Sequence, residues 1–172
     1  MVKIIKGKLD VADTITDDKF VADYVNLRKP VVLTGMTKQW PALKKWTVDY
    51  FNEKYGNLTV PVCKLQGGLS HPPNYEIKTK LSTYLTLMQQ QDAHASTRSI
   101  QDMSDNKEHI VQYLQQCPVS YFKDIQKDYT MPTLLDKAPY TTFGLNTIFI
   151  GSTHTRTTLH YDRPLVDNLY CQ

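Results

Sequence analysis

The 172 residues carry 41% hydrophobic and 22% charged side chains and a formal net charge of +3. This is the composition of an ordinary soluble chain, long enough for one core of the common domain size. The lysines are scattered along the sequence, so no DNA-binding face is expected, because such a face gathers basic residues with arginine or aromatic partners.

The cysteine pattern and the hydropathy of the sequence bear on the cellular compartment of the protein. Cys63, Cys117 and Cys171 form no C-x-x-C pair, and their odd number and wide spacing argue against a disulfide framework. The N-terminus lacks an apolar signal core, and no run of about 18 apolar residues occurs. We therefore expect a cytoplasmic or nuclear protein without a membrane partner.

Hydrophobic periodicity and capping residues in the first half predict helices mixed with short strands. Pro61 indicates an edge strand, because proline cannot donate a hydrogen bond to a neighbouring strand. Leu81, Leu85 and Met88 recur at helical spacing and are expected in the core. In chain order we expect a helix at 16–27, a short buried strand at 30–35, a brief helix at 40–46, a helix at 47–55 capped by Thr47, the edge strand at 58–65, a loop at 66–78 and a helix around 81–88.

The second half begins with a polar stretch at 89–107, which is typical of an exposed connection. The alternation of apolar residues beyond it predicts further strands. In chain order we expect a strand at 118–125, a short helix at 130–137, a strand at 141–150 and an apolar strand at 168–171.

One short motif, His160-Tyr-Asp162, carries candidate chemistry. On an extended strand both side chains project to the same face and can hold a metal ion from one side. With 5 His and 14 Asp in the sequence, chance alone gives about 0.4 such triplets, so the setting matters more than the motif. The pair follows a strand that ends at Gly151 and a polar turn at 152–156, and small barrels present ligands to a pocket in this way.

Four stretches occur in a characteristic order: RKPVVLTG, WPALKKWTVDYF, PVSYFKD, and IFIGSTHTRTTLHYD followed by DNLYCQ. In this order they resemble the jumonji-C or cupin-like Fe(II)- and 2-oxoglutarate-dependent dioxygenases, particularly the protein-hydroxylase and tRNA-wybutosine-hydroxylase-like branch. The resemblance implies a mixed α and β fold, in which N-terminal helices and strands lead into the first half of a double-stranded β-helix. It also implies a protein side chain or an RNA base as substrate.

The resemblance further implies a site for Fe(II) and 2-oxoglutarate. The family's 2-His-1-carboxylate triad leaves open positions on the metal for the cosubstrate and oxygen. By position, His160 and Asp162 would be two of the metal ligands. Thr157, Asn168 and Tyr121 would offer a hydroxyl, an amide and a phenol to the cosubstrate. Thr157 and Asn168 fit turn residues equally well, and Tyr121 fits a packed ring with its hydroxyl at the surface.

The sequence departs from the family pattern after Asp162. The family's Gly-x-Lys stretch, whose lysine binds the cosubstrate, and its distal histidine ligand would both follow Gln172. We therefore expect a single domain over 1–172 that lacks its C-terminal half, with 1–140 as the N-terminal part and 141–172 as the first strands of an incomplete barrel. The last strand would be an unpaired apolar edge, so either the chain is a C-terminally truncated fragment or another polypeptide completes the sheet.

Three functions from different classes stay open. The first is the dioxygenase, and the second is a non-catalytic cupin-like interaction module that uses the N-terminal elements as a binding surface. The third is another metal-binding cupin, such as a sugar isomerase, which the stretches KPVVLTG and WPALKKWT disfavour. The substrate cannot be read from the sequence, because one barrel supports many binding surfaces.

For these 172 residues as they stand, we expect no conversion of 2-oxoglutarate to succinate above background. A site with one histidine and one carboxylate holds Fe(II) weakly, and the cosubstrate would lack its basic partner. A succinate assay with added Fe(II) and ascorbate measures this. Steady turnover that is abolished in His160→Ala would contradict it.

Overall fold

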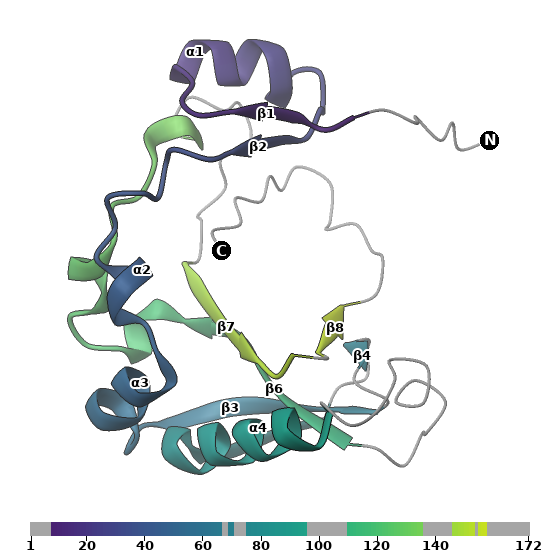
Figure 1. The fold of residues 1–172 in the computed structure, drawn as a ribbon, viewed down its shortest axis with the longest axis vertical. Helices are drawn as coiled ribbons and strands as arrows, with labels where there is room; N and C mark the ends of the chain where they lie inside the picture. The colour runs from purple at the N-terminus through teal and green to yellow at the C-terminus, as the bar shows by residue number, and fades with distance from the viewer. Residues whose placement is uncertain are drawn as a thin grey trace. The chain divides into compact units, whose positions relative to one another are not determined.

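The computed structural model of the protein describes residues 8–66, 69–70, 75–95, 110–135, 146–153 and 155–157 (Figure 1). These residues form two compact units. The first draws on the described parts of Met1–Leu43 and Lys127–Gly144, and the second on those of Lys44–Gln126 and Leu145–Tyr161. Two short elements, α2 (Ala42–Lys45) and the 3-10 turn η3 (Ile125–Asp128), cross the boundary between the units.

The first unit is built on a two-stranded parallel sheet, with a helix beside it (Figure 1). The Thr16 hydroxyl caps this helix by accepting a hydrogen bond from the Lys19 N–H at 3.4 Å. The Asp10 carboxylate accepts hydrogen bonds from Lys29 Nζ at 2.6 Å and the Tyr24 hydroxyl at 3.3 Å. The elements are β1 (Asp10–Ala12), α1 (Asp17–Phe20), the π-helical turn η1 (Val21–Val25), β2 (Val31–Leu33) and the 3-10 turn η4 (Thr133–Leu135).

Two expectations for the first unit are confirmed with modifications. The helix predicted at 16–27 forms, but as one α-helical turn that continues into η1. The strand predicted at 30–35 forms as β2, but it is not buried, because Val32 is 41% exposed and its neighbour Val11 is 63% exposed. A two-stranded sheet covered on one face leaves its other face to solvent.

The second unit contains a four-stranded antiparallel sheet in the order β5-β3-β6-β7, with the long helix α4 along one face (Figure 1). A separate parallel pair joins β4 to β8. The elements are α3 (Val48–Tyr55), β3 (Thr59–Gln66), β4 (Leu69–Ser70), β5 (Tyr75–Lys80), α4 (Leu81–Ala95), β6 (Ile110–Pro118), the 3-10 turn η2 (Val119–Tyr121), β7 (Thr147–Gly151) and β8 (Arg156–Thr157).

The core of the second unit lies between α4 and the sheet, with α3 at one end. The predicted α4 stripe is confirmed, and so is the cap of α3, where the Thr47 hydroxyl accepts the Tyr50 N–H at 3.1 Å. The Phe122 ring meets the rings of Phe51 and Tyr55 edge to face, with centroids 5.8 and 5.3 Å away. The side chains of this core that are less than 3% exposed are Val60, Val62, Leu65, Leu81, Tyr84, Leu85, Leu114, Cys117, Phe122 and Ile125.

The hydroxyl of Tyr84 on α4 is inserted between strands β6 and β7. Leu114 and Ile150 stand opposite each other in the ladder. The Leu114 N–H donates to the Tyr84 oxygen at 3.2 Å, and the Tyr84 hydroxyl donates to the Ile150 carbonyl. The register shifts between Leu114 and Cys117, and within this bulge Gln116 has a φ of 52°. Burial raises the pKa of the Tyr84 phenol, so the hydroxyl keeps its proton and stays a donor.

The edge-strand prediction for 58–65 was wrong. β3 is an inner strand that pairs with β5 on one side and β6 on the other. Pro61 is tolerated because it pairs with Lys78 of β5, whereas pairing with β6 begins only at Cys63. The proline therefore lies where the strand has a neighbour on one side.

Three other predicted boundaries were also wrong. The loop expected at 66–78 contains β4 and β5, and α4 extends to Ala95 into the expected connection at 89–107. The strand expected at 118–125 lies earlier, as β6, and is followed by 3-10 turns. In each case pairing or packing with distant residues overrides the local pattern. The helix expected at 130–137 forms only as the short turn η4, and the strand expected at 141–150 is described from Thr147 as β7.

Within the part of the chain that the structure describes, no helix is long and apolar enough to span a bilayer. Cys63 and Cys117 are both free thiols. Burial raises the pKa of the Cys117 thiol to about 11. The expected strand at 168–171 lies outside the described residues, and the single-domain organisation stays a prediction.

Replacing Tyr84 by phenylalanine should lower the free energy of unfolding by about 1–3 kcal/mol, because the ring is kept while the buried Leu114 N–H and Ile150 carbonyl lose their partner. Urea denaturation of the parent and the variant measures the difference. Tyr121→Phe is the matched control, since Tyr121 is 44% exposed and should change stability by less than about 0.5 kcal/mol. Equal stability of Tyr84→Phe and the parent would contradict the bridging role.

Candidate functional site

The structure describes two of the five residues predicted from the sequence to form the site. Thr157 and Tyr121 have defined positions, whereas His160, Asp162 and Asn168 lie outside the described residues. The relative directions of the imidazole and the carboxylate therefore stay a prediction. The geometry of the site is built from the strand and turn that lead to Thr157.

Thr157 is the last residue of β8 and is exposed. β8 pairs in parallel with β4, so that Thr157 stands opposite Ser70. The backbone of Arg156 and Thr157 is thus held in an extended conformation by a neighbouring strand. This arrangement leaves the Thr157 hydroxyl able to serve a ligand or solvent.

A compact turn connects β7 to β8. The Thr155 N–H donates to the Ser152 carbonyl at 2.9 Å, and the two hydroxyl oxygens lie 3.1 Å apart. Ser152 is buried although it is polar, and this hydrogen bond satisfies its hydroxyl. From the other side, Asp92 Oδ1 of α4 accepts the Thr153 N–H at 2.6 Å. The turn is therefore fixed both internally and by the helix.

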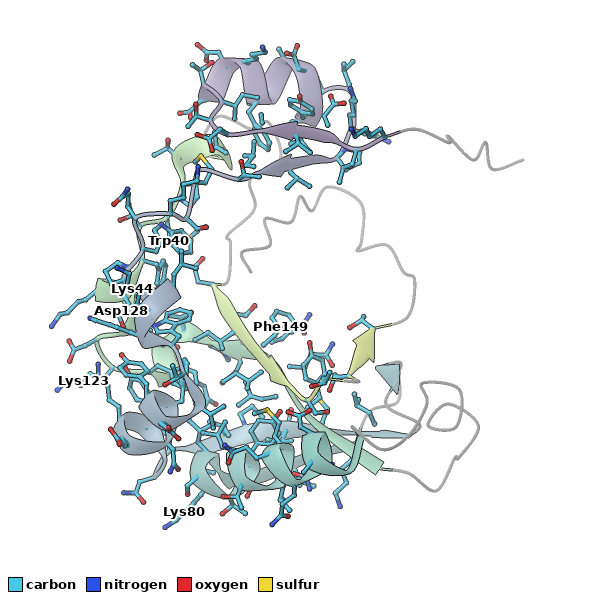
Figure 2. All side chains as sticks on the ribbon, in the orientation of Figure 1. Trp40, Lys44, Lys80, Lys123, Asp128 and Phe149 are labelled. Atoms are coloured by element: carbon cyan, nitrogen blue, oxygen red, sulfur yellow. The ribbon has the colours of Figure 1, made fainter. Side chains whose placement is uncertain are left out.

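Tyr113 and Phe149 form an aromatic pair on the sheet face opposite α4. Their ring centroids are 6.2 Å apart, and Figure 2 shows Phe149 on the side of β7 away from α4. Since successive strand residues alternate between faces, Tyr113 points away from the side to which the buried Leu114 belongs. Tyr113 stands opposite Gly151, the last residue of β7. The pair therefore lies at the strand end from which the candidate ligand segment departs.

The same face carries a thiol and a carboxylate. Cys63 stands opposite Tyr113 on one side and opposite Glu76 on the other, so all three share this face. Burial, together with the negative charge of Glu76, raises the pKa of the Cys63 thiol. A thiol shifted in this direction is a poor nucleophile at neutral pH, which argues against a cysteine-based reaction.

Tyr121 occupies a different position from the strand residues. It ends η2, directly after β6, and its side chain is 44% exposed. The predicted contact of its phenol with a cosubstrate stays a prediction. Sequence reasoning did not select Tyr113, although it belongs to the alternating stretch of β6 and faces β7 at the turn.

Among the described residues, no group of three or more His, Cys, Asp or Glu side chains could hold a metal ion. The predicted metal ligands, His160 and Asp162, lie outside the described residues. His160 and Asp162 come three and five residues after Thr157, and an imidazole with a carboxylate is a donor set that suits Fe(II).

A family model described as cupin-like domain matches residues 17–172. The chain belongs to the cupin-like, JmjC-related family. The mixed α and β structure of this cupin-like domain, with its antiparallel sheet, agrees with the fold class expected from the sequence.

Curated relatives of the cupin-like domain have names that describe demethylases, hydroxylases and a tRNA-modifying protein. Lysine-specific demethylase JMJ21 of Arabidopsis thaliana is 32% identical over 85 residues, which are 49% of this chain and 8% of the relative. The bifunctional arginine demethylase and lysyl-hydroxylase psr-1 of Caenorhabditis briggsae is 44% identical over 43 residues, or 25% of this chain and 11% of the relative. The tRNA wybutosine-synthesizing protein 5 of Gallus gallus is 35% identical over 75 residues, or 44% of this chain and 22% of the relative. The matches thus span less than a quarter of each of these relatives.

A methyl group added at Gly151 should crowd the aromatic pair. Its Cβ would lie 3.0 Å from two ring carbons of Tyr113 and 3.0 Å from the Thr155 hydroxyl oxygen. Gly151→Ala should therefore destabilise the fold by about 1–3 kcal/mol, as overpacking does. Urea denaturation measures the loss. The loss should shrink when Tyr113→Ala is introduced in both backgrounds, and an undiminished loss would contradict the contact.

Proposed function

We propose that this cupin-like domain binds Fe(II) and 2-oxoglutarate and is part of an oxygenase that hydroxylates a protein side chain or an RNA base. The observation that carries the proposal is the fixed turn after β7, which leads through the paired residue Thr157 to His160-Tyr-Asp162 within the segment matched by the family model. A double-stranded β-helix is the fold proposed for the whole domain.

In this proposal His160 and Asp162 hold the metal through an imidazole nitrogen and a carboxylate oxygen. The chemistry that bound Fe(II) supplies in such a site is the oxygen-dependent conversion of 2-oxoglutarate to succinate and carbon dioxide, coupled to hydroxylation of a C–H bond. A protein that offers few ligands leaves positions open for the cosubstrate. The role of this chain's residues is to bind and orient both.

The cosubstrate would be oriented by hydroxyl and amide groups. By their positions in the family pattern, we assign Thr157 to its distal carboxylate and the Asn168 amide to the same ligand, and hydrogen bonds to a charged carboxylate are stronger than those between neutral groups. Tyr121 is retained as the candidate phenol from the sequence. Tyr113 is added, since it stands opposite Gly151 at the start of the turn.

The second candidate function is a non-catalytic interaction module. It is favoured by the exposed aliphatic side chains Val11 and Val32, which are neighbours in the parallel sheet of the first unit. The two functions differ in one property that can be measured directly. The oxygenase requires metal binding through His160 and Asp162, whereas the module does not.

Titration with Co(II), a stand-in for Fe(II) that needs no reductant, tests the proposal by absorption spectroscopy and calorimetry. The parent should bind Co(II) weakly, as expected of a site with one histidine and one carboxylate, and His160→Ala and Asp162→Ala should each weaken binding further by roughly tenfold or more, because each removes a ligand. Thr157→Val should leave Co(II) affinity unchanged but weaken 2-oxoglutarate binding to the Co(II)-loaded protein by about tenfold.

His109→Ala is the matched control, because it removes an imidazole outside the motif. Circular dichroism of each variant shows whether the fold is retained. Binding of Co(II) that is unaffected by either ligand substitution would sink the oxygenase proposal. Absence of measurable Co(II) binding in the parent would favour the non-catalytic interaction module as the function.

A further inference from the structure

Asp92 lies on α4, although it is not a strong helix former. It belongs to the described part of the helix, Leu81–Ala95. Aspartate is a weaker helix former than alanine. Its place is therefore not explained by the helix itself.

The contact across to the turn after β7 accounts for Asp92. Its Oδ1 accepts the Thr153 N–H at 2.6 Å, and hydrogen bonds to ionised groups are roughly twice as strong as neutral ones. Through this carboxylate α4 contacts the turn, in which two further hydrogen bonds join Ser152 to Thr155. The carboxylate therefore fixes the middle of a turn whose ends are already held.

The same helix also holds the strand before the turn. Tyr84, two turns earlier on α4, bridges Leu114 and Ile150. One rigid helix thus fixes both the last part of β7 and the turn that follows it. Thr157 comes four residues after Thr153, and His160 comes seven residues after it.

We propose that Asp92 is a positioning residue for the metal- and cosubstrate-binding segment, because its carboxylate fixes the Thr153 amide and thereby the turn that leads into that segment. This inference rests on the proposed function. Asp92 itself touches neither metal nor cosubstrate in this proposal. It acts through the backbone from Thr153 to Thr157.

If Asp92 is a positioning residue, its replacement should lower Co(II) affinity without a matching loss of fold stability. Asp92→Ala removes the brace, but it also introduces a better helix former. The midpoint of thermal unfolding should therefore stay within a few degrees of the parent value. Co(II) affinity should fall by about tenfold, the effect typical of groups that orient metal ligands.

The experiment compares Asp92→Ala, Asp92→Asn and the control Gln89→Ala, which alters an exposed residue of the same helix. Co(II) affinity is measured by calorimetry, and exchange of the Thr153 amide hydrogen is measured by NMR. Asn keeps an oxygen that can accept the Thr153 N–H, so it should retain Co(II) affinity within about threefold. The Thr153 amide should exchange at least about tenfold faster in Asp92→Ala than in the parent, and Gln89→Ala should change neither quantity.

Each other outcome overturns the inference in a distinguishable way. Unchanged Co(II) affinity in Asp92→Ala removes the positioning role while the proposed function stands. Loss of affinity together with a large fall in the unfolding midpoint identifies Asp92 as a general structural residue, and an equal loss in Asp92→Asn excludes the hydrogen bond as the cause. If the parent binds no Co(II), the proposed function and the role of Asp92 toward the metal both fail, and the exchange rates show by themselves whether the brace exists.

Discussion

The second unit depends on the hydroxyl group of Tyr84, which bridges strands β6 and β7. At the bulge in β6, the Tyr84 oxygen accepts a hydrogen bond from the Leu114 N–H, and its hydroxyl donates a hydrogen bond to the Ile150 carbonyl. A buried amide and carbonyl without partners would cost more than the bulge gains. The bridge therefore lets α4 hold β7 in register. Because the turn to Thr157 follows β7 directly, this attachment also positions the turn.

The candidate chemistry makes use of this rigidity. Metal and cosubstrate ligands must be held within a narrow range of positions to be effective, and sites on strands are more exact than sites on free loops. Here the short pair of β8 with β4, the hydrogen-bonded turn and the carboxylate of Asp92 all act on a stretch of a few residues before the histidine. The family model also matches this stretch, and this match is the reason for proposing that it binds metal and cosubstrate.

Local signals in the sequence predicted part of the helical structure. The cap at Thr47 and the apolar stripe of α4 depend on neighbouring residues, and both were predicted correctly. The strands were harder, because β3 is an inner strand only through its pairing with β5 and β6, which no local pattern encodes. In the candidate site, Thr157 was selected by its spacing from His160, and its role stays a prediction. Tyr113 and Asp92 could not be found, because their significance comes from contacts with residues 38 and 61 positions away.

Strand β5 forms one border of the four-stranded sheet, and its residues Glu76, Lys78 and Lys80 are all exposed. A second strand added at this border would have to place its side chains against these charged groups, and charged residues on an edge strand, lysine above all, discourage intermolecular strand addition. The border should lose this protection at high ionic strength, since salt at about 1 M shortens the range of charge repulsion to about 3 Å. Concentrated stocks of the protein should therefore stay clear in dilute buffer and become turbid first in strong salt.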